Sequence, residues 1–132
     1  MTAQRPDKLT VLLVDDDRDI LESVGQLFEF FLPEYLLLTV ASPREAFDVL
    51  QGRHVDVIIS DFRMPEMDGV EFLRRARHAW PAIPRFLFTA YPDDQLFERA
   101  RREAYVRGVI TKPCDAESFR GPLTGLLHVA AP

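Results

Sequence analysis

Residues 55–69, VDVIISDFRMPEMDG, contain the pattern that decides the fold. The stretch begins with residues 55–60, a short apolar run rich in β-branched side chains, which predicts a buried strand. Asp61 follows at once, and a polar loop leads to Asp68 and Gly69, where we expect a helix to begin. A strand, a loop and a helix make the first part of a βαβ unit, so the rest of the chain should repeat this alternation.

The same alternation extends in both directions along the chain. Further strands are predicted at residues 9–14, 35–40, 85–90 and 109–111. Apolar residues at helical spacing follow each strand. Gly121 and Pro122 interrupt the last segment, residues 115–129, so we expect its helix to be kinked or to start late. The alternation predicts an α/β fold: a flavodoxin-like, doubly wound (βα)5 domain with a parallel five-stranded sheet in the order 2-1-3-4-5.

Length and composition indicate one globular unit. The chain has 132 residues, of which 47% are hydrophobic and 28% charged, as in a packed domain rather than a disordered segment. We expect an N-terminal tail over residues 1–8 and one domain over residues 9–129. The 16 Lys and Arg against 21 Asp and Glu give a net charge of −5, which disfavours direct contact with nucleic acid or an anionic membrane.

Cysteine usage and hydropathy narrow the chemistry and the location further. Cys114 is the only cysteine, which excludes an internal disulfide and a cysteine cage for zinc, and we expect its thiol to be buried and structural. No run approaches the ~18 apolar residues of a membrane span, and residues 1–8 lack the apolar stretch of a signal peptide. These features predict a cytoplasmic protein.

Ionisable residues and one hydroxyl lie at the carboxyl ends of several predicted strands. In a parallel sheet the carboxyl ends of the strands meet at one edge, so these side chains should converge. They are Asp15, Asp16 and Asp17 after the first strand, Asp61 after the third, Thr89 in the fourth and Lys112 after the fifth. Two carboxylates about 5 Å apart repel by roughly 3 kcal/mol at an effective dielectric constant of about 20, so such a cluster attracts a hard divalent cation. Oxygen ligands favour Mg²⁺, and a lysine and a hydroxyl beside it suit a phosphoryl group that an aspartate can accept.

In this combination the residues resemble the receiver domain of two-component response regulators, similar to the chemotaxis regulators. The resemblance covers about residues 9–127. Its motifs are VDDD at 14–17, DFRMPEMDG at 61–69, TA at 89–90 and TKP at 111–113. It implies a Mg²⁺-dependent phosphoryl transfer from a histidine kinase or a phosphotransfer protein. A change of shape would follow in the face formed by the fourth and fifth strands and helices.

The same resemblance implies a role for each site residue. Asp61 would be the phosphoacceptor. The Mg²⁺ ligands would be the side chains of Asp15, Asp16 and Asp61 and the backbone carbonyl of Arg63, with Asp15 acting through water. Thr89 would hydrogen-bond to a phosphoryl oxygen, and Lys112 would pair with its charge. The Lys112–Pro113 bond would be cis, as in the family.

The resemblance also implies a mode of assembly and two local departures. Receivers can form a homodimer through the fourth helix, fifth strand and fifth helix, and they act as signalling modules rather than as enzymes. The family usually has an aromatic residue where this chain has Val109, so we expect switching through movement of the fourth helix alone. Arg63 and Tyr91 occupy positions that affect how long the acyl phosphate survives.

Two alternatives remain open. A phosphatase of the haloacid dehalogenase-like class would use Asp15 as nucleophile and Asp17 as acid or base. That class expects Thr or Val where Asp19 stands, and it leaves Asp61 without a role. A degenerate receiver would serve only for docking or dimerisation, without phosphorylation.

Arginines gather in two places away from the strand ends. The first group is Arg74, Arg75 and Arg77, and the second is Arg99, Arg101, Arg102 and Arg107. Charged runs of this kind usually form solvated helix faces. The second group lies on the predicted output face, where contact with a partner is the alternative interpretation.

Overall fold

The structure is a computed structural model that describes residues 8–113 and 115–130, with side chains described as far as residue 125. The expectations for the tail over residues 1–7 and for the thiol of Cys114 lie outside the described residues. Among the helices of the described ranges, none combines the length and the apolar character that crossing a membrane requires.

Five strands and five helices alternate along the chain. The strands are β1 (Leu9–Val14), β2 (Tyr35–Val40), β3 (Val57–Asp61), β4 (Arg85–Thr89) and β5 (Gly108–Thr111). The helices are α1 (Arg18–Phe31), α2 (Pro43–Gly52), α3 (Gly69–Ala79), α4 (Asp94–Ala104) and α5 (Ala116–Ala130). All strand pairs are parallel, and the order is β2-β1-β3-β4-β5, so the predicted doubly wound fold is confirmed.

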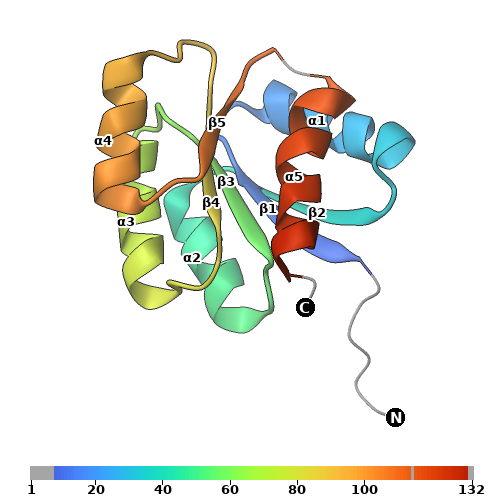
Figure 1. Cartoon of the computed structure of the whole chain (residues 1–132), viewed down its shortest axis with the longest axis horizontal. Coiled ribbons are helices and arrows are strands. Elements are labelled where there is room, and N and C mark those ends of the chain that lie inside the picture. The colour runs from blue at the N-terminus through green and yellow to red at the C-terminus, as the bar shows by residue number, and fades with distance from the viewer. Residues whose placement is uncertain (1–7, 114, 131–132) are drawn as a thin grey trace.

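Helices cover both faces of the sheet. Helices α1 and α5 lie on one face, and α2, α3 and α4 lie on the other (Figure 1). Successive residues of β1 therefore enter different cores: Val11 and Leu13 pack with α1 and α5, while Leu12 and Val14 pack with α2, α3 and α4. A strand covered on both sides is apolar at nearly every position, which explains the run LTVLLV, in which Thr10 is the one polar residue.

Polar side chains begin the helices at the carboxyl end of the sheet. The side chain of Asp17 accepts hydrogen bonds from the first turn of α1, and Ser42, Asp68 and Asp93 do the same for α2, α3 and α4. Each such cap contributes about 1 kcal/mol to helix stability. Because each cap follows a strand closely, the caps also set the short loops that surround the carboxyl edge.

The strand boundaries differ from the sequence prediction by one residue at the end of β3, the end of β4 and the start of β5, and two further differences are larger. Strand β3 begins at Val57 rather than at residue 55, because the Asp56 carboxylate accepts a hydrogen bond from the Thr10 backbone N–H at 2.7 Å. Helix α5 begins at Ala116, so the late start predicted from Pro122 is wrong. The proline removes only one backbone donor, whereas Phe119 and Leu123, both fully buried, hold this part of the helix against the sheet.

The first turn of α3 provides a prediction on acid stability. Arg74 and Arg75 hydrogen-bond to Glu71, and they lower the pKa of its carboxyl from 4.5 to about 2. A carboxyl with a lower pKa in the folded state stabilises the fold above its unfolded pKa, and this contribution is lost as the pH falls from about 4.5 towards 2. We expect Glu71→Gln to lower the free energy of unfolding at pH 7 by about 0.5–1 kcal/mol, since surface pairs are weak. Urea unfolding should show this difference narrowing below pH 4.5; a difference that stays constant with pH would contradict the pairing.

Candidate metal centre

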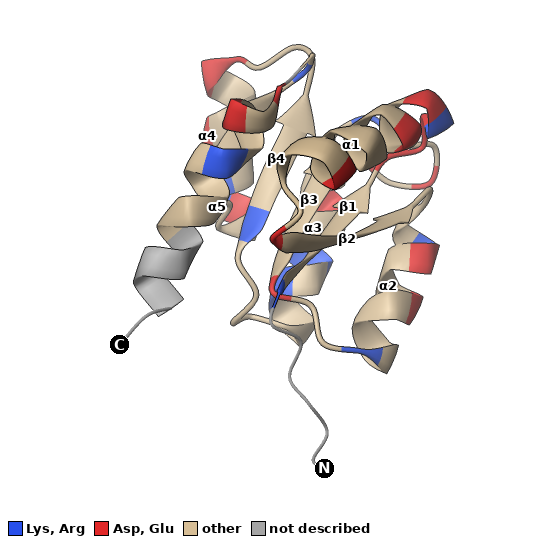
Figure 2. Cartoon of the chain, turned by 90° about the vertical axis from the view of Figure 1, so that its right-hand side faces the viewer, with Lys and Arg blue, Asp and Glu red and all other residues tan. Residues whose placement is uncertain are grey.

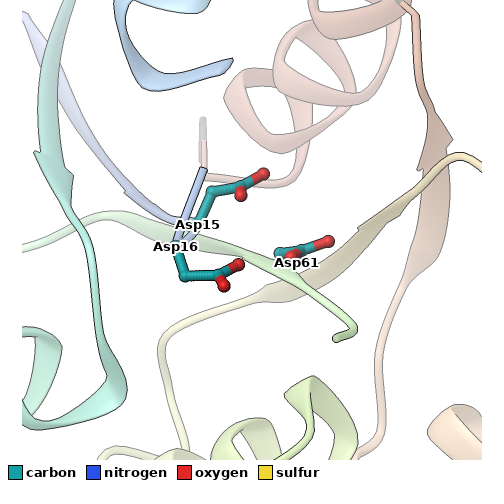
Figure 3. Close-up of side chains that lie close together, drawn as sticks. All are labelled: Asp15, Asp16 and Asp61. Carbon is teal, nitrogen blue, oxygen red and sulfur yellow. The ribbon is translucent and has the colours of Figure 1, made fainter. Parts of the chain in front are cut away.

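The parallel register brings three aspartates together at the carboxyl edge of the sheet. Val14 of β1 lies beside Ser60 of β3, so the residues that follow them, Asp15 and Asp61, are neighbours. Asp16 comes next in the chain, and the three carboxylates point into the same space (Figure 3). One oxygen of each carboxylate lies within 4.8 Å of the others, and Asp15 and Asp61 are buried while Asp16 is exposed. Acidic residues also mark the starts of α1 and α4 at this end of the molecule (Figure 2).

Lys112 joins two of these aspartates. Its Nζ donates to Asp15 Oδ2 at 2.6 Å and to Asp61 Oδ1 at 2.9 Å, and the lysine side chain is only 14% exposed. The Lys112–Pro113 bond is cis, and the Lys112 backbone N–H donates to the Thr89 carbonyl at 2.9 Å. A residue at the end of β5 is thereby held over the ends of β1 and β3.

Burial and charge act in opposite directions on the ionisation of this cluster. Burial raises the pKa of the Asp61 carboxyl, and the negative charge of Asp15 adds to this effect, while the hydrogen bond from Lys112 opposes it. For Lys112, burial alone would lower the pKa, but the hydrogen bonds to Asp15 and Asp61 raise it above the ordinary value. Lys112 is therefore a permanent positive charge at neutral pH, and Asp61 is a carboxylate that gains from a further cation.

The donor set fits Mg²⁺. Three carboxylates against one ammonium leave an excess of two negative charges when all are ionised, which matches a divalent ion. All donors are oxygens, and exposed Asp16 leaves room for the water ligands that Mg²⁺ retains. Asp16 and Arg63 line a hollow of about 430 Å³ together with Met64, Pro65 and Asp68, so the loop that would offer the Arg63 carbonyl borders the same space.

The remaining predicted residues fall into two groups. Thr89 ends β4, is 5% exposed, and lies at the same edge; its Oγ1 accepts a hydrogen bond from the Tyr91 N–H at 3.2 Å. Asp17 does not join the cluster, because its Oδ1 accepts hydrogen bonds from the backbone N–H groups of Asp19 and Ile20. Asp17 is thus a helix cap, and the acid or base role that the phosphatase alternative needs is not available to it.

Sequence reasoning missed a contact that holds the loop beside the cluster. Asp68, the cap of α3, also pairs with Arg99 of α4 at 3.1 Å. Gly69 follows, and its N–H donates to the Phe62 carbonyl at 2.6 Å, which closes the loop after Asp61. The capping role of Asp68 is visible in the sequence, but its partner lies 31 residues away on another helix and leaves no local signal.

Relatives with similar sequences are mostly larger proteins. The chain is 36% identical over 104 residues to the hydrogenase transcriptional regulatory protein HoxA of Cupriavidus necator, covering 79% of the chain and 21% of HoxA. It is 32% identical over 125 residues to the transcriptional regulatory protein GlrR of Escherichia coli, covering 92% of the chain and 27% of GlrR. The chain therefore spans about a fifth to a quarter of the length of these relatives.

Solved structures agree over nearly the whole fold. The signal receiver domain of an HD domain-containing protein from Pseudomonas fluorescens Pf-5 superposes with a TM-score of 0.84 at 30% identity, covering 97% of this chain and 93% of that one. The chemotaxis response regulator CheY4 of Vibrio cholerae superposes with a TM-score of 0.79 at 28% identity, covering 90% of this chain and 98% of that one.

The family model for the response regulator receiver domain matches residues 11–123. This range contains β2 to β5, most of β1 and every residue of the acidic cluster. The resemblance drawn from the strand-end residues is thus confirmed, and the phosphatase alternative is not supported. The chain belongs to the family of response regulator receiver domains, the signal receivers of two-component systems.

Proposed function

We propose that this receiver accepts a phosphoryl group on Asp61, in a Mg²⁺-dependent reaction with the phosphohistidine of a histidine kinase or a phosphotransfer protein. The observation that carries the proposal is the position of Lys112 Nζ, 2.6 Å from Asp15 and 2.9 Å from Asp61 within an acidic cluster. A lysine between two carboxylates can pair with the Asp61 carboxylate before the transfer and with an oxygen of the attached phosphoryl group after it.

The transfer replaces one bond with another. An oxygen of Asp61 forms a bond to phosphorus, and the phosphorus–nitrogen bond of the donor breaks, with its electron pair left on the imidazole. Mg²⁺, when bound, offsets the repulsion between the Asp61 carboxylate and the phosphoryl oxygens. The side chains of Asp15, Asp16 and Asp61 and the carbonyl of Arg63 are the proposed ligands, with Asp15 acting through water.

Lys112 and Thr89 have separate roles in this proposal. Lys112 remains protonated, because its hydrogen bonds to Asp15 and Asp61 raise its pKa, and it pairs with a phosphoryl oxygen. The Thr89 hydroxyl donates to another phosphoryl oxygen. Turning toward the phosphoryl group would break the hydrogen bond from the Tyr91 N–H to Thr89 Oγ1. The loop between β4 and α4 would then be released, which connects the charge change at Asp61 to movement of α4.

The surroundings of Val109 are consistent with a switch that moves α4. Val109 is half-buried, and it lines a hollow of about 280 Å³ with Phe97 of α4 and with the start of that helix. We infer that switching proceeds without an aromatic gate at this position. We also infer that the receiver unit extends over residues 9–129 after a tail of residues 1–8, that it works in the cytoplasm, and that α4, β5 and α5 form its dimer face.

A direct test measures the intact mass of the protein after incubation with Mg²⁺ and acetyl phosphate, a small acyl-phosphate donor. The expected result is a gain of one phosphoryl group, which disappears when a chelator removes Mg²⁺. A receiver that serves only for docking would gain no mass under either condition, and this outcome would overturn the proposal.

The Mg²⁺ site can be tested separately through Asp16. This carboxylate is exposed, so Asp16→Asn should leave the fold intact while removing one of the charges that hold the ion. We expect the affinity for Mg²⁺ to fall about tenfold or more, because the charge of the ligand set tunes the affinity of such sites. Isothermal titration with MgCl₂ measures this, and Asp19→Asn in the first turn of α1 is the matched control. An equal loss of affinity in both variants would count against Asp16 as a ligand.

A further inference from the structure

Five arginines gather at the end of the sheet opposite the aspartates. Arg77 lies in the last turn of α3, and Arg101 and Arg102 lie in the last turn of α4. Arg85 is the first residue of β4, and Arg107 directly precedes β5. All strands are parallel, so these positions lie at the amino edge of the sheet, whereas Asp61 ends β3 at the opposite edge. We call these five residues the arginine cluster.

The arginine cluster holds more positive charge than its neighbours neutralise. Arg101 pairs with Glu98 at 2.8 Å. No carboxylate of the described part of the chain lies within 4.0 Å of the guanidinium groups of Arg77, Arg85, Arg102 or Arg107. Burial lowers the pKa of Arg85, and the positive charges of Arg77 and Arg107 add to this effect. The whole chain carries a net charge of −5, and this surface therefore opposes the overall sign.

Tyr105 stands in the middle of the arginine cluster, where it is the C-cap of α4. Its backbone is left-handed, with φ 52° and ψ 44°, which costs roughly 1 kcal/mol or more for a residue other than glycine. Its side chain is 56% exposed, and the Arg77 Cζ lies 3.4 Å from the ring centroid. The ring forms the wall of a surface hollow of about 490 Å³ with Arg101, Arg102 and Val106. The end of α4 accounts for the left-handed backbone, whereas an exposed aromatic ring among arginines is a typical feature of a binding surface.

Helix stability alone does not account for this arrangement. Arginines at the ends of α3 and α4 complement the helix dipoles. However, the buried guanidinium of Arg85 already donates to the Ala104 carbonyl at the end of α4, at 2.8 Å. Arg107 lies outside any helix, and a helix end does not require the exposed ring of Tyr105. The charges of Arg102 and Arg107 therefore remain available to a ligand.

We propose that Tyr105 and the arginines of the cluster other than buried Arg85 form a docking surface for an acidic peptide segment of a partner protein. Guanidinium groups bind carboxylates through paired hydrogen bonds, and the tyrosine ring offers apolar contact between them. The charges are spread over α3, α4 and the start of β5 around an open hollow, which suits several carboxylates along a chain better than one small anion. A long nucleic acid would extend beyond the arginine cluster and meet the acidic remainder of the surface.

The first test uses fluorescence anisotropy with a fluorescein-labelled, glutamate-rich peptide, and the same peptide with Gln for Glu as the uncharged control. The glutamate peptide should bind and the glutamine peptide should not. The double change Arg101→Gln and Arg102→Gln should weaken binding about tenfold or more. The double change Arg74→Gln and Arg75→Gln removes the same charge from arginines that pair with Glu71, and should leave binding within about twofold of the original protein. Absence of binding, or an equal loss in both double variants, would overturn the proposal.

The variant Tyr105→Gly tests whether Tyr105 binds the peptide or only supports the fold. Tyr105→Gly relieves the left-handed strain, so the melting temperature should stay the same or rise, while the affinity for the glutamate peptide should fall. Loss of stability with unchanged peptide binding would indicate a purely structural residue and contradict the proposal. Competition identifies the ligand class: displacement of the peptide by equimolar pyrophosphate or by a short single-stranded DNA would show that the surface binds phosphates rather than peptide carboxylates, and would also overturn it.

Discussion

Asp61→Asn is expected to abolish incorporation of the phosphoryl group from acetyl phosphate. The amide has the shape of the carboxylate, and its oxygen can still accept the hydrogen bond from Lys112, so the fold should survive. The amide oxygen is not a nucleophile, however, and one of the three carboxylates around the proposed Mg²⁺ position is lost. Intact-mass measurement at saturating Mg²⁺ should therefore show no gain, whereas Asp16→Asn should still gain mass when Mg²⁺ is raised to compensate for its weaker binding.

The same variant has a second expected signature in thermal stability. Burial raises the pKa of the Asp61 carboxyl, so its ionised form is disfavoured in the folded state. When the pKa of a carboxyl is higher in the folded than in the unfolded state, the free energy of unfolding falls as the pH rises through the folded pKa. Without Mg²⁺ at neutral pH, Asp61→Asn should therefore melt at the same temperature as the original protein or higher. Mg²⁺ should raise the melting temperature of the original protein more than that of the variant, because it binds only the folded state.

Persistent phosphorylation of Asp61→Asn would point to a different acceptor. Asp15 is the neighbouring carboxylate, but it is fully buried and its Oδ1 accepts from the Asp17 N–H while its Oδ2 accepts from Lys112. Both of its oxygens are thus engaged. Peptide fragmentation locates the phosphorylated residue in the variant. A phosphoryl group on Asp15 would contradict the assignment of Asp61 as the acceptor.

The meeting of the strand-end residues could be predicted because five alternating strands and helices suit a common doubly wound order, 2-1-3-4-5, in which parallel strands end at one edge. Five apolar runs placed five strands, and a sheet of this order brings the ends of β1 and β3 together. This order makes Asp15 and Asp61 neighbours, and the side chain of Lys112, which follows the edge strand β5, reaches both of them. Each step requires only the register of strands, which their hydrophobic length controls.

Contacts between distant side chains could not be predicted in this way. The pair of Asp68 and Arg99 and the stacking of Arg77 on Tyr105 each join α3 or its cap to α4. Both depend on how two helices pack against each other, which a single sequence does not record. Asp17 belongs to the same acidic run as Asp15 and Asp16, but it lies one residue further along the chain, and its side chain caps the first turn of α1.

Gly69→Ala is the change expected to cost most stability. Gly69 is buried at the start of α3, and a β-carbon there would lie 2.9 Å from the carbonyl carbon of Asp61 and 3.0 Å from the α-carbon of Phe62. Both atoms belong to the backbone, so no side-chain rotation makes room. Either α3 moves away from β3 or the loop after Asp61 opens, and the hydrogen bond from the Gly69 N–H to the Phe62 carbonyl is lost. Forced overpacking typically costs about 1–3 kcal/mol, and the additional lost hydrogen bond places this variant at about 3 kcal/mol or more.

Gly25→Ala provides the matched control, because a β-carbon at Gly25 in α1 would meet no atom within 4 Å. Alanine is favoured over glycine in a helix, so this variant should be more stable by about 0.5–1 kcal/mol. Thermal melts of the two variants should thus shift in opposite directions, by on the order of 10 °C downward for Gly69→Ala and by a few degrees upward for Gly25→Ala. Phosphoryl incorporation should slow only in Gly69→Ala, since the displaced backbone is that of Asp61. If Gly69→Ala has the same melting temperature as the original protein, the loop beside Asp61 accommodates the β-carbon without strain. Gly69 would then not be needed to hold Asp61 in place.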